Sequence, residues 1–170
     1  MKISNSNKNK DPLPVLLAGT FEAKAPTSQL RDSVNRILET LSGQLSEQAI
    51  TLNVDICDSL RYALNASLFE RAVRCLCEQS IHGMPCGGEL IITAVEQADG
   101  IDLEIADSRN DYIESPRLLD GQSDQTFTEL IPVHYFVAVH GGTVRVQNCP
   151  EGGVAFTIHL PFSQALRSAA

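Results

Sequence analysis

The stretch LIPVHYFVAVHGGTVRVQNCPEGGVAFTIHLP, residues 130–161, changes its hydrophobic period twice. The apolar residues of 131–139 predict a helix with one buried face. The sequence HGG at 140–142 follows, and two glycines after a periodic segment favour the left-handed C-cap that ends a helix. Residues 143–147 and 154–160 then alternate apolar and polar side chains on either side of a turn, as strands do. The stretch therefore predicts a helix, a turn and a β-hairpin.

The first half of the chain predicts two amphipathic helices separated by a strand. Apolar residues recur every three or four positions over 30–48, and we expect Thr27 or Ser28 to cap this helix. Residues 50–56 alternate strictly, which predicts a half-buried strand. A loop is expected at 58–65, with its last residue, Asn65, capping the second helix.

A hairpin and a long irregular segment come next. Residues 90–95 and 101–105 predict two strands joined by a turn at Asp99-Gly100. Between 107 and 127 no period is visible, and a loop of that length inside a compact domain is usually functional. We also expect an edge strand at 14–21.

This order of elements places the chain in the α/β class. It predicts a two-layer α/β sandwich, in which a mixed, mostly antiparallel sheet carries helices on one face. Residues 1–12 are rich in Asn, Ser and Lys, so we expect a disordered tail there. One domain then spans 13–162, and 163–170 form a C-terminal tail.

Composition narrows the class of partner. The formal charge of -8 and only 13 basic residues argue against a binder of nucleic acid, because that affinity depends largely on clustered Lys and Arg. No run of apolar residues is long enough to span a membrane, and the first residues lack the apolar core of a signal peptide. The five cysteines have no regular spacing, which fits a reducing compartment. We therefore expect a soluble, cytoplasmic protein.

The HGG at 140–142, the turn CPEGG and the closing FTIHLP resemble the C-terminal part of the histidine-kinase-type ATPase domain of the GHKL superfamily, the Bergerat fold. Residues 68–90, LFERAVRCLCEQSIHGMPCGGEL, resemble the asparagine-box helix of that family and the turn after it. Residues 101–113 resemble the strand with the first glycine box, and 108–127 fall where the family has its ATP lid. The resemblance extends over roughly 20–162.

The resemblance places the vestige of an asparagine box on the second helix. In the family this box puts a carboxamide on Mg²⁺, and here the matching position is Gln79, with Cys75 four residues earlier and His82 where many kinases have Lys. The side chain of Gln79 is longer than Asn by one methylene, and Mg²⁺ tolerates little departure from octahedral geometry. Cys75 replaces a position that serves some relatives as a general base, a role for which a protonated thiol is too weakly basic.

The two glycine boxes have lost their glycines. The first box normally reads Asp-x-Gly-x-Gly, with Asp as the adenine ligand, and here it reads DSRND at 107–111. Asp107 remains, either as an adenine ligand or as a solvated strand end, and the replacing side chains occupy space that a nucleotide needs. The second box aligns with Phe127 and Glu129, and we expect these two to block the phosphate position, since a carboxylate there repels a triphosphate.

Three other groups of residues could carry a function. Cys75, Cys77, His82 and Cys86 lie close in sequence, but two cysteines spaced by two point to different sides of a helix, so no metal site is expected. His134 on the predicted helix is either a phosphoacceptor or a plain surface histidine. Arg109 and Arg117 form either a partner surface or a solvated loop.

These residues leave two main functional hypotheses. In the first, the chain has no catalytic residues and no cofactor. It is then a pseudo-ATPase that binds and regulates a signalling protein, such as a kinase, a response regulator or a sigma or anti-sigma factor. In the second, it is an active protein kinase that uses ATP with Mg²⁺ and resembles the anti-sigma-factor kinases. A variant of the second makes it one half of a split histidine kinase.

Overall fold

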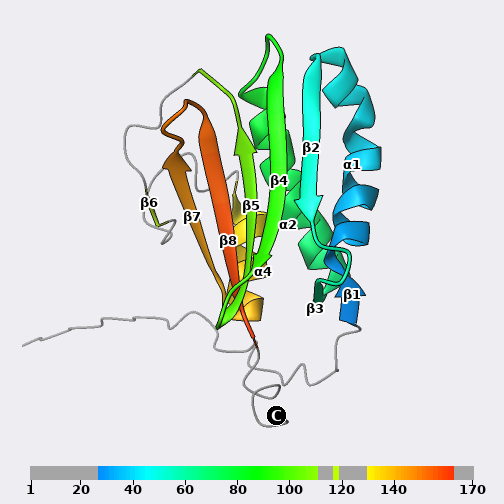
Figure 1. The fold of residues 1–170 in the computed structure, drawn as a ribbon, viewed down its shortest axis with the longest axis vertical. Coiled ribbons are helices and arrows are strands. Elements are labelled where there is room, and N and C mark those ends of the chain that lie inside the picture. The colour runs from blue at the N-terminus through cyan, green and yellow to red at the C-terminus, as the bar shows by residue number, and fades with distance from the viewer. Residues whose placement is uncertain (1–26, 111–116, 119–129, 163–170) are drawn as a thin grey trace, which may run out of the picture.

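The computed structural model describes residues 27–110, 117–118 and 130–162, and every element below lies in these ranges (Figure 1). The helices are α1 (Leu30–Glu47), α2 (Ala66–His82) and α4 (Ile131–His140). The strands are β1 (Thr27–Gln29), β2 (Ile50–Ile56), β3 (Arg61–Ala63), β4 (Gly88–Glu96), β5 (Gly100–Asp107), β6 (Arg117–Leu118), β7 (Thr143–Asn148) and β8 (Val154–Pro161).

Six of the described strands form one sheet in the order β2-β4-β5-β8-β7-β6. The β2–β4 pair is parallel and the other pairs are antiparallel. The helices cover one face of this sheet (Figure 1). This arrangement confirms the predicted two-layer α/β sandwich with a mixed, mostly antiparallel sheet. A second, two-stranded sheet pairs β1 with β3.

The core lies between the sheet and the helices. Every second residue of the central strands points into it, so Leu90 and Ile92 of β4 and Leu103 and Ile105 of β5 are fully buried. Phe69 of α2 and Phe136 of α4 meet edge to face, with ring centroids 5.7 Å apart. This apolar layer holds α2 and α4 against the centre of the sheet, beside the end of β5.

The capping residues predicted at the start of α2 and at the end of α4 are confirmed. The side chain of Asn65 accepts a hydrogen bond from the backbone N–H of Leu68, as an N-cap does. Gly141 takes the left-handed conformation with φ 66° and ends α4. Strand β2 has the bounds that the alternation of 50–56 predicted.

Two predictions in the first half of the chain are wrong. Thr27 and Ser28 do not cap α1, because they belong to β1, and the N-cap residue is Gln29, whose side chain makes no capping bond. The expected loop at 58–65 contains β3, which pairs with β1. Both errors have one cause: pairing between segments more than thirty residues apart in sequence overrides a local capping preference.

Two further expectations need correction or lie outside the described residues. The segment after Asp107 includes the short strand β6, which pairs with β7 and extends the sheet. The expected edge strand at 14–21 and the tails at 1–12 and 163–170 are outside the described residues. Among the described helices, none is long and apolar enough to cross a membrane.

Candidate functional site

The site that the sequence singles out lies at the end of β5, where Asp107 is the last residue of the strand. Its neighbours in the sheet are Leu90 of β4 and Val154 of β8. The backbone of Gly153 comes so close to Asp107 that any Cβ there would collide with the Asp107 carbonyl oxygen, and its φ of 93° also favours glycine. The tight PEGG turn therefore fixes β8 against the strand end that carries Asp107.

The carboxylate of Asp107 is buried, with 0% of the side chain exposed. Burial of an ionised carboxylate is very costly unless a charged group and hydrogen bonds compensate it. The sequence left open whether Asp107 is an adenine ligand or a solvated strand end, and its burial excludes the solvated strand end. What matters for function is which group compensates this charge.

Arg109, two residues further along the chain, supplies the compensating charge. Its Nη2 donates to Oδ2 of Asp107 at 2.6 Å and its Nε donates to Oδ1 at 2.8 Å. The backbone N–H of Arg109 also donates to Oδ1, at 3.2 Å. Two parallel N–H···O bonds between a guanidinium and a carboxylate form the strongest and most specific geometry of such a pair. We call this pair the Asp107–Arg109 clamp.

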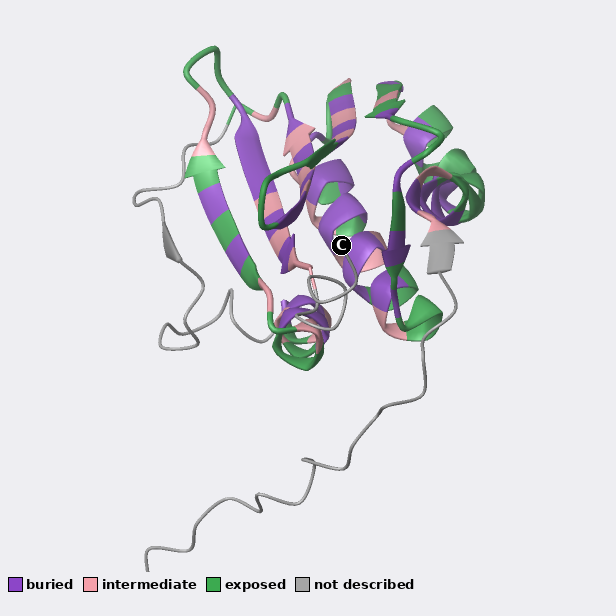
Figure 2. Cartoon of the chain, turned by 60° about the horizontal axis from the view of Figure 1, so that its bottom comes forward, coloured by how far each residue is buried: buried purple, intermediate pink, exposed green. Residues whose placement is uncertain are grey.

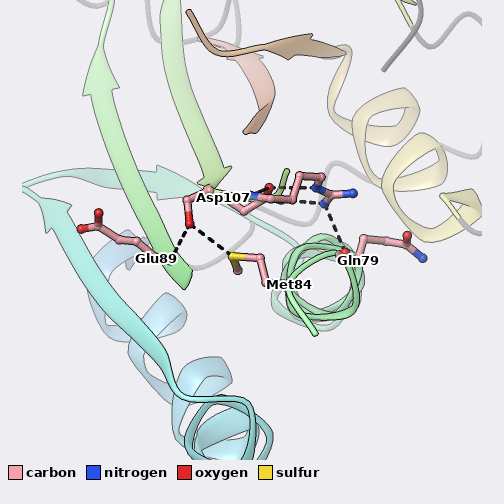
Figure 3. A network of polar contacts seen from close by, with 6 residues as sticks. Gln79, Met84, Glu89 and Asp107 are labelled. Carbon is pink, nitrogen blue, oxygen red and sulfur yellow. Dashed lines mark hydrogen bonds and ion pairs between the residues drawn. The ribbon is translucent and has the colours of Figure 1, made fainter. Parts of the chain in front are cut away.

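The guanidinium is held from three sides, and Figure 3 shows two of them, at Asp107 and at Gln79. Besides Asp107, its Nη2 donates to the backbone carbonyl of Gln79 on α2 at 3.2 Å. Its Cζ lies 5.9 Å from the ring centroid of Phe156 on β8, within the range of a cation–π contact. Only 15% of the Arg109 side chain is exposed. The clamp thus joins the ends of β5, β8 and α2.

Gly83, which follows α2, leaves the space that Arg109 fills. A Cβ at this position would lie 2.6 Å from Cζ of Arg109, a distance that side chains essentially never show. The φ of Gly83 is -70°, so the backbone itself would accept alanine. The absence of a side chain at position 83 is therefore a steric requirement of the clamp.

Ser108, between the two clamp residues, ties the end of β5 to the start of β4 and to Met84 in the turn after α2. Its Oγ accepts from the backbone N–H of Glu89 at 2.8 Å, and its own N–H donates to the Glu89 carbonyl. The same hydroxyl donates to Sδ of Met84 at 3.8 Å. A Cβ at Gly88 would lie 2.7 Å from this Oγ, so the space between the turn and β5 is filled. Figure 3 marks these contacts of Met84 and Glu89 with dashed lines.

The structure brings together only part of the predicted set. Gln79 joins the Asp107 network through its backbone carbonyl. Cys75 is half-buried on α2, and His82 is exposed at the last position of that helix. Phe127 and Glu129 lie outside the described residues, so the prediction that they block the phosphate position stays a prediction. No group of three or more His, Cys, Asp or Glu side chains that could hold a metal lies within the described ranges.

His140 of the HGG has a structural role. Its Nδ1 lies 2.8 Å from the carbonyl oxygen of Phe136, and its Nε2 accepts from the backbone N–H of Asn65 at 3.2 Å. These two contacts require the tautomer with hydrogen on Nδ1. The histidine therefore links the C-terminal end of α4 to the start of α2.

Sequence reasoning missed the clamp and the role of Gly83. It treated Arg109 as a side chain in the space of a nucleotide and as part of a partner surface, and the structure turns this side chain inward onto Asp107. One signal was available: an arginine two residues after a strand-end aspartate can reach back to that carboxylate. Nothing local marks Gly83, because its neighbour in space is 26 residues away.

Comparison with known proteins gives the class of fold. The chain has the fold of the histidine-kinase catalytic domain. The catalytic domain of histidine kinase ThkA superimposes with a TM-score of 0.69 at 16% sequence identity, over 79% of this chain and 94% of that one. The mycobacterial sensor histidine kinase MprB gives 0.65 at 21% identity, over 79% and 95%. The sequence matches no protein-family model.

A curated relative is the sensor protein KdpD of Escherichia coli (strain K12). It is 26% identical to this chain over 161 residues, covering 85% of the chain. The alignment spans 17% of the length of KdpD, so this chain corresponds to a small part of that protein.

Proposed function

We propose that this chain is a pseudo-ATPase: a histidine-kinase catalytic-domain fold that no longer binds ATP and acts as a protein-binding regulatory module in signal transduction. The observation that carries the proposal is the Asp107–Arg109 clamp. The carboxylate that would accept from an adenine amino group already accepts from a guanidinium of the same chain.

The clamp lowers nucleotide affinity because a nucleotide can reach Asp107 only after Arg109 has left. Breaking one partner out of a buried ion pair costs about 3–5 kcal/mol. Each 1.4 kcal/mol is tenfold in a binding constant, so the clamp alone weakens binding by a factor on the order of 100 or more. A site that would otherwise bind with a Kd of about 0.1 mM would then have a Kd of about 10 mM.

The neighbouring residues support the same proposal. The carbonyl of Gln79 already accepts from Arg109, which occupies the end of α2 facing the site. Ser108 and Arg109 occupy the second and third positions of the first glycine box, where the resemblance implies a variable residue and a glycine. Their side chains fill space against Met84 and Gly83. The proposed module needs neither ATP nor Mg²⁺.

The signalling part of the proposal rests on the relatives. One ThkA structure that this chain resembles, with a TM-score of 0.67, is a complex with the response regulator protein TrrA. We infer that this chain, too, binds a protein of a signalling pathway in the cytoplasm, such as a kinase, a response regulator or a sigma or anti-sigma factor. Its acidic composition, with a formal charge of -8, gives no reason to expect nucleic acid.

An ATP-dependent protein kinase is the second candidate. Asp107 is still present at the end of β5, and the similar structure of full-length ShkA, with a TM-score of 0.65, contains AMPPNP. In that case Arg109 must leave Asp107 when the nucleotide arrives.

Two measurements test the proposal together. Isothermal titration with Mg-ADP should give no binding heat up to millimolar concentration. In a phosphotransfer assay with a purified kinase and response regulator from the same organism, the chain should change the transfer rate, and Asp107→Asn with a correctly folded core should still do so. Saturable Mg-ADP binding, or a regulatory effect that requires Asp107 and nucleotide, would favour the kinase instead.

A further inference from the structure

Strand β2 is an edge of the six-stranded sheet. It pairs with β4 on one side, and no described strand lies on its other side. The backbone N–H and C=O groups that point away from β4 therefore have no strand partner within the described residues. At the end of the strand, the carbonyl of Ile56 accepts from Nη1 of Arg31 at 3.0 Å. Residues 50–55 thus form an open edge, which we call the β2 edge.

The β2 edge lacks the features that usually prevent a sheet edge from pairing with another chain. Its register with β4 is continuous from Ile50 to Ile56, so no bulge turns it away from a partner. The strand contains no proline and no lysine, and Asp55 is its one charged residue. Its Ile, Thr and Val residues also favour the extended conformation. An edge of this kind is a template for an added strand.

The helix layer leaves the middle of β2 uncovered. Leu52 points to the same side of the sheet as its partner Leu90, which is fully buried between the sheet and the helices. Leu52 itself is 38% exposed, although Ile50 and Ile56 at the two ends of the strand are buried. Figure 2 shows this exposed stretch beside α1. A side chain from an added strand can therefore pack against Leu52.

We propose that the β2 edge binds an extended segment of a partner protein as an additional strand. Only an extended backbone can pair with a row of alternating N–H and C=O groups, so the edge selects the conformation of its partner. Leu52 selects an apolar side chain on the helix side, and Asp55 favours a basic or neutral residue opposite it. This inference rests on the proposed protein-binding function and names the kind of partner segment. The proposed loss of ATP binding does not depend on it.

A second copy of the chain fits this edge less well than a single strand. Two identical β2 strands would pair about a two-fold axis perpendicular to the sheet, which keeps both helix layers on the same side. Helix α1 packs alongside β2, as Figures 1 and 2 show, so the two copies of α1 would meet beneath the joined strands. A partner segment without such a helix avoids this collision.

A synthetic strand tests the proposal directly. The probe is the fluorescein-labelled peptide Lys-Val-Thr-Val-Thr-Val-Lys with blocked ends, titrated with the full chain and followed by fluorescence anisotropy. Its control peptide is N-methylated at each of its five central residues, so it keeps the charges and side chains but cannot donate along a strand. In the chain, Leu52→Lys places a charge under the added strand. Val95→Lys on β4 is the matched control, because Val95 is also exposed and lies away from the β2 edge.

We expect saturable binding of the unmodified peptide with a Kd below about 0.1 mM, and no binding of the N-methylated one. Leu52→Lys should weaken binding about tenfold or more, and Val95→Lys should change it less than about twofold. In the wild-type chain, bound peptide should slow the hydrogen exchange of backbone amides in 50–55, which tests the site without any substitution. Thermal melting verifies that both variants remain folded.

Four results would overturn the proposal. The first is an absence of saturable binding up to a concentration on the order of 1 mM. The second is equal binding of the two peptides, and the third is an equal loss of affinity in Leu52→Lys and Val95→Lys. The fourth is a wild-type dimer that Leu52→Lys converts to a monomer in sedimentation, because a second copy would then occupy the edge.

Discussion

Replacing either residue of the Asp107–Arg109 clamp should destabilise the fold strongly, and replacing both should cost much less than the sum. The carboxylate is fully buried and the guanidinium is 15% exposed, so each charge loses its compensation when the other is removed. Removing one partner of such a pair costs about 3–5 kcal/mol. Arg109→Met, which keeps the length of the side chain, and Asp107→Asn, which keeps its shape, should therefore each lower the free energy of unfolding by about 3 kcal/mol.

The double variant removes both charges, so we expect a loss of about 3–4 kcal/mol, which corresponds to a coupling free energy of about 2–3 kcal/mol. The assay is urea unfolding of the four proteins at neutral pH, supported by thermal melting. In a chain of this size each kcal/mol shifts the Tm by about 2–4 °C, so the single variants should melt about 6–12 °C lower.

The matched control is the Arg74–Glu70 pair on α2, which is an exposed i,i+4 contact of 3.3 Å. A cycle of Arg74→Met and Glu70→Gln should give a coupling of only about 0.3–0.5 kcal/mol. If the losses at Asp107 and Arg109 add within about 0.5 kcal/mol, the two side chains do not form a clamp in solution, and the argument against nucleotide binding loses its basis.

Three further predictions follow from individual residues. Gly83→Ala should push the guanidinium off Asp107 and lower the free energy of unfolding, measured by urea denaturation, by about 1–3 kcal/mol. Gly43→Ala inside α1 is the control and should not destabilise the fold, because nothing lies within 4 Å of the new Cβ. Equal losses of stability in the two variants would contradict the steric role of Gly83. Hydrogen bonds from Ser59 lower the pKa of the exposed Cys57 thiol. Iodoacetamide should therefore modify Cys57 more slowly in Ser59→Ala, which mass spectrometry can follow. An unchanged rate of Cys57 modification would refute this prediction. Burial lowers the pKa of His134 below its ordinary 6.5, so the folded state binds a proton at His134 less readily than the unfolded state. The free energy of unfolding should therefore fall as the pH drops from 7.5 to 5. Urea unfolding of His134→Gln should show a smaller dependence on pH.

Much of the fold could be predicted because its signals are local. Strict alternation over 50–56 defines β2, and the two glycines after His140 define the end of α4. A tight turn and a regular period depend on residues only a few positions apart, so they are visible in the sequence. The mixed sheet then follows from the order of the elements.

What the sequence did not reveal depends on long-range contacts. The β1–β3 ladder joins Thr27 to Ala63, and neither strand is long enough to carry a period of its own. The exposed side of α4 was also missed: Ile131 and Val139 were expected on the buried face, and both are half exposed. A helix that is apolar all round gives no pattern from which its buried side can be chosen.

The sequence predicted which positions form the candidate site, but not which side chains contact one another there. The sequence singled out Asp107 and the side chains that replace the glycines beside it. It did not pair Asp107 with Arg109, because that pairing needs the open space at Gly83 and the ring of Phe156, which come from other elements. The predicted obstruction by Phe127 and Glu129 remains to be tested.

The most direct test of the central claim is thermal melting of the wild-type chain with and without millimolar Mg-ATP, Mg-ADP and a non-hydrolysable analogue. A ligand at 100 times its Kd would add about 2.7 kcal/mol of stability and raise the Tm by about 5–10 °C. We expect no shift with any of the three, because Arg109 already pairs with the carboxylate of Asp107. A clear shift that disappears in Asp107→Asn, tested in a folded variant, would contradict it and make this chain a nucleotide-binding domain.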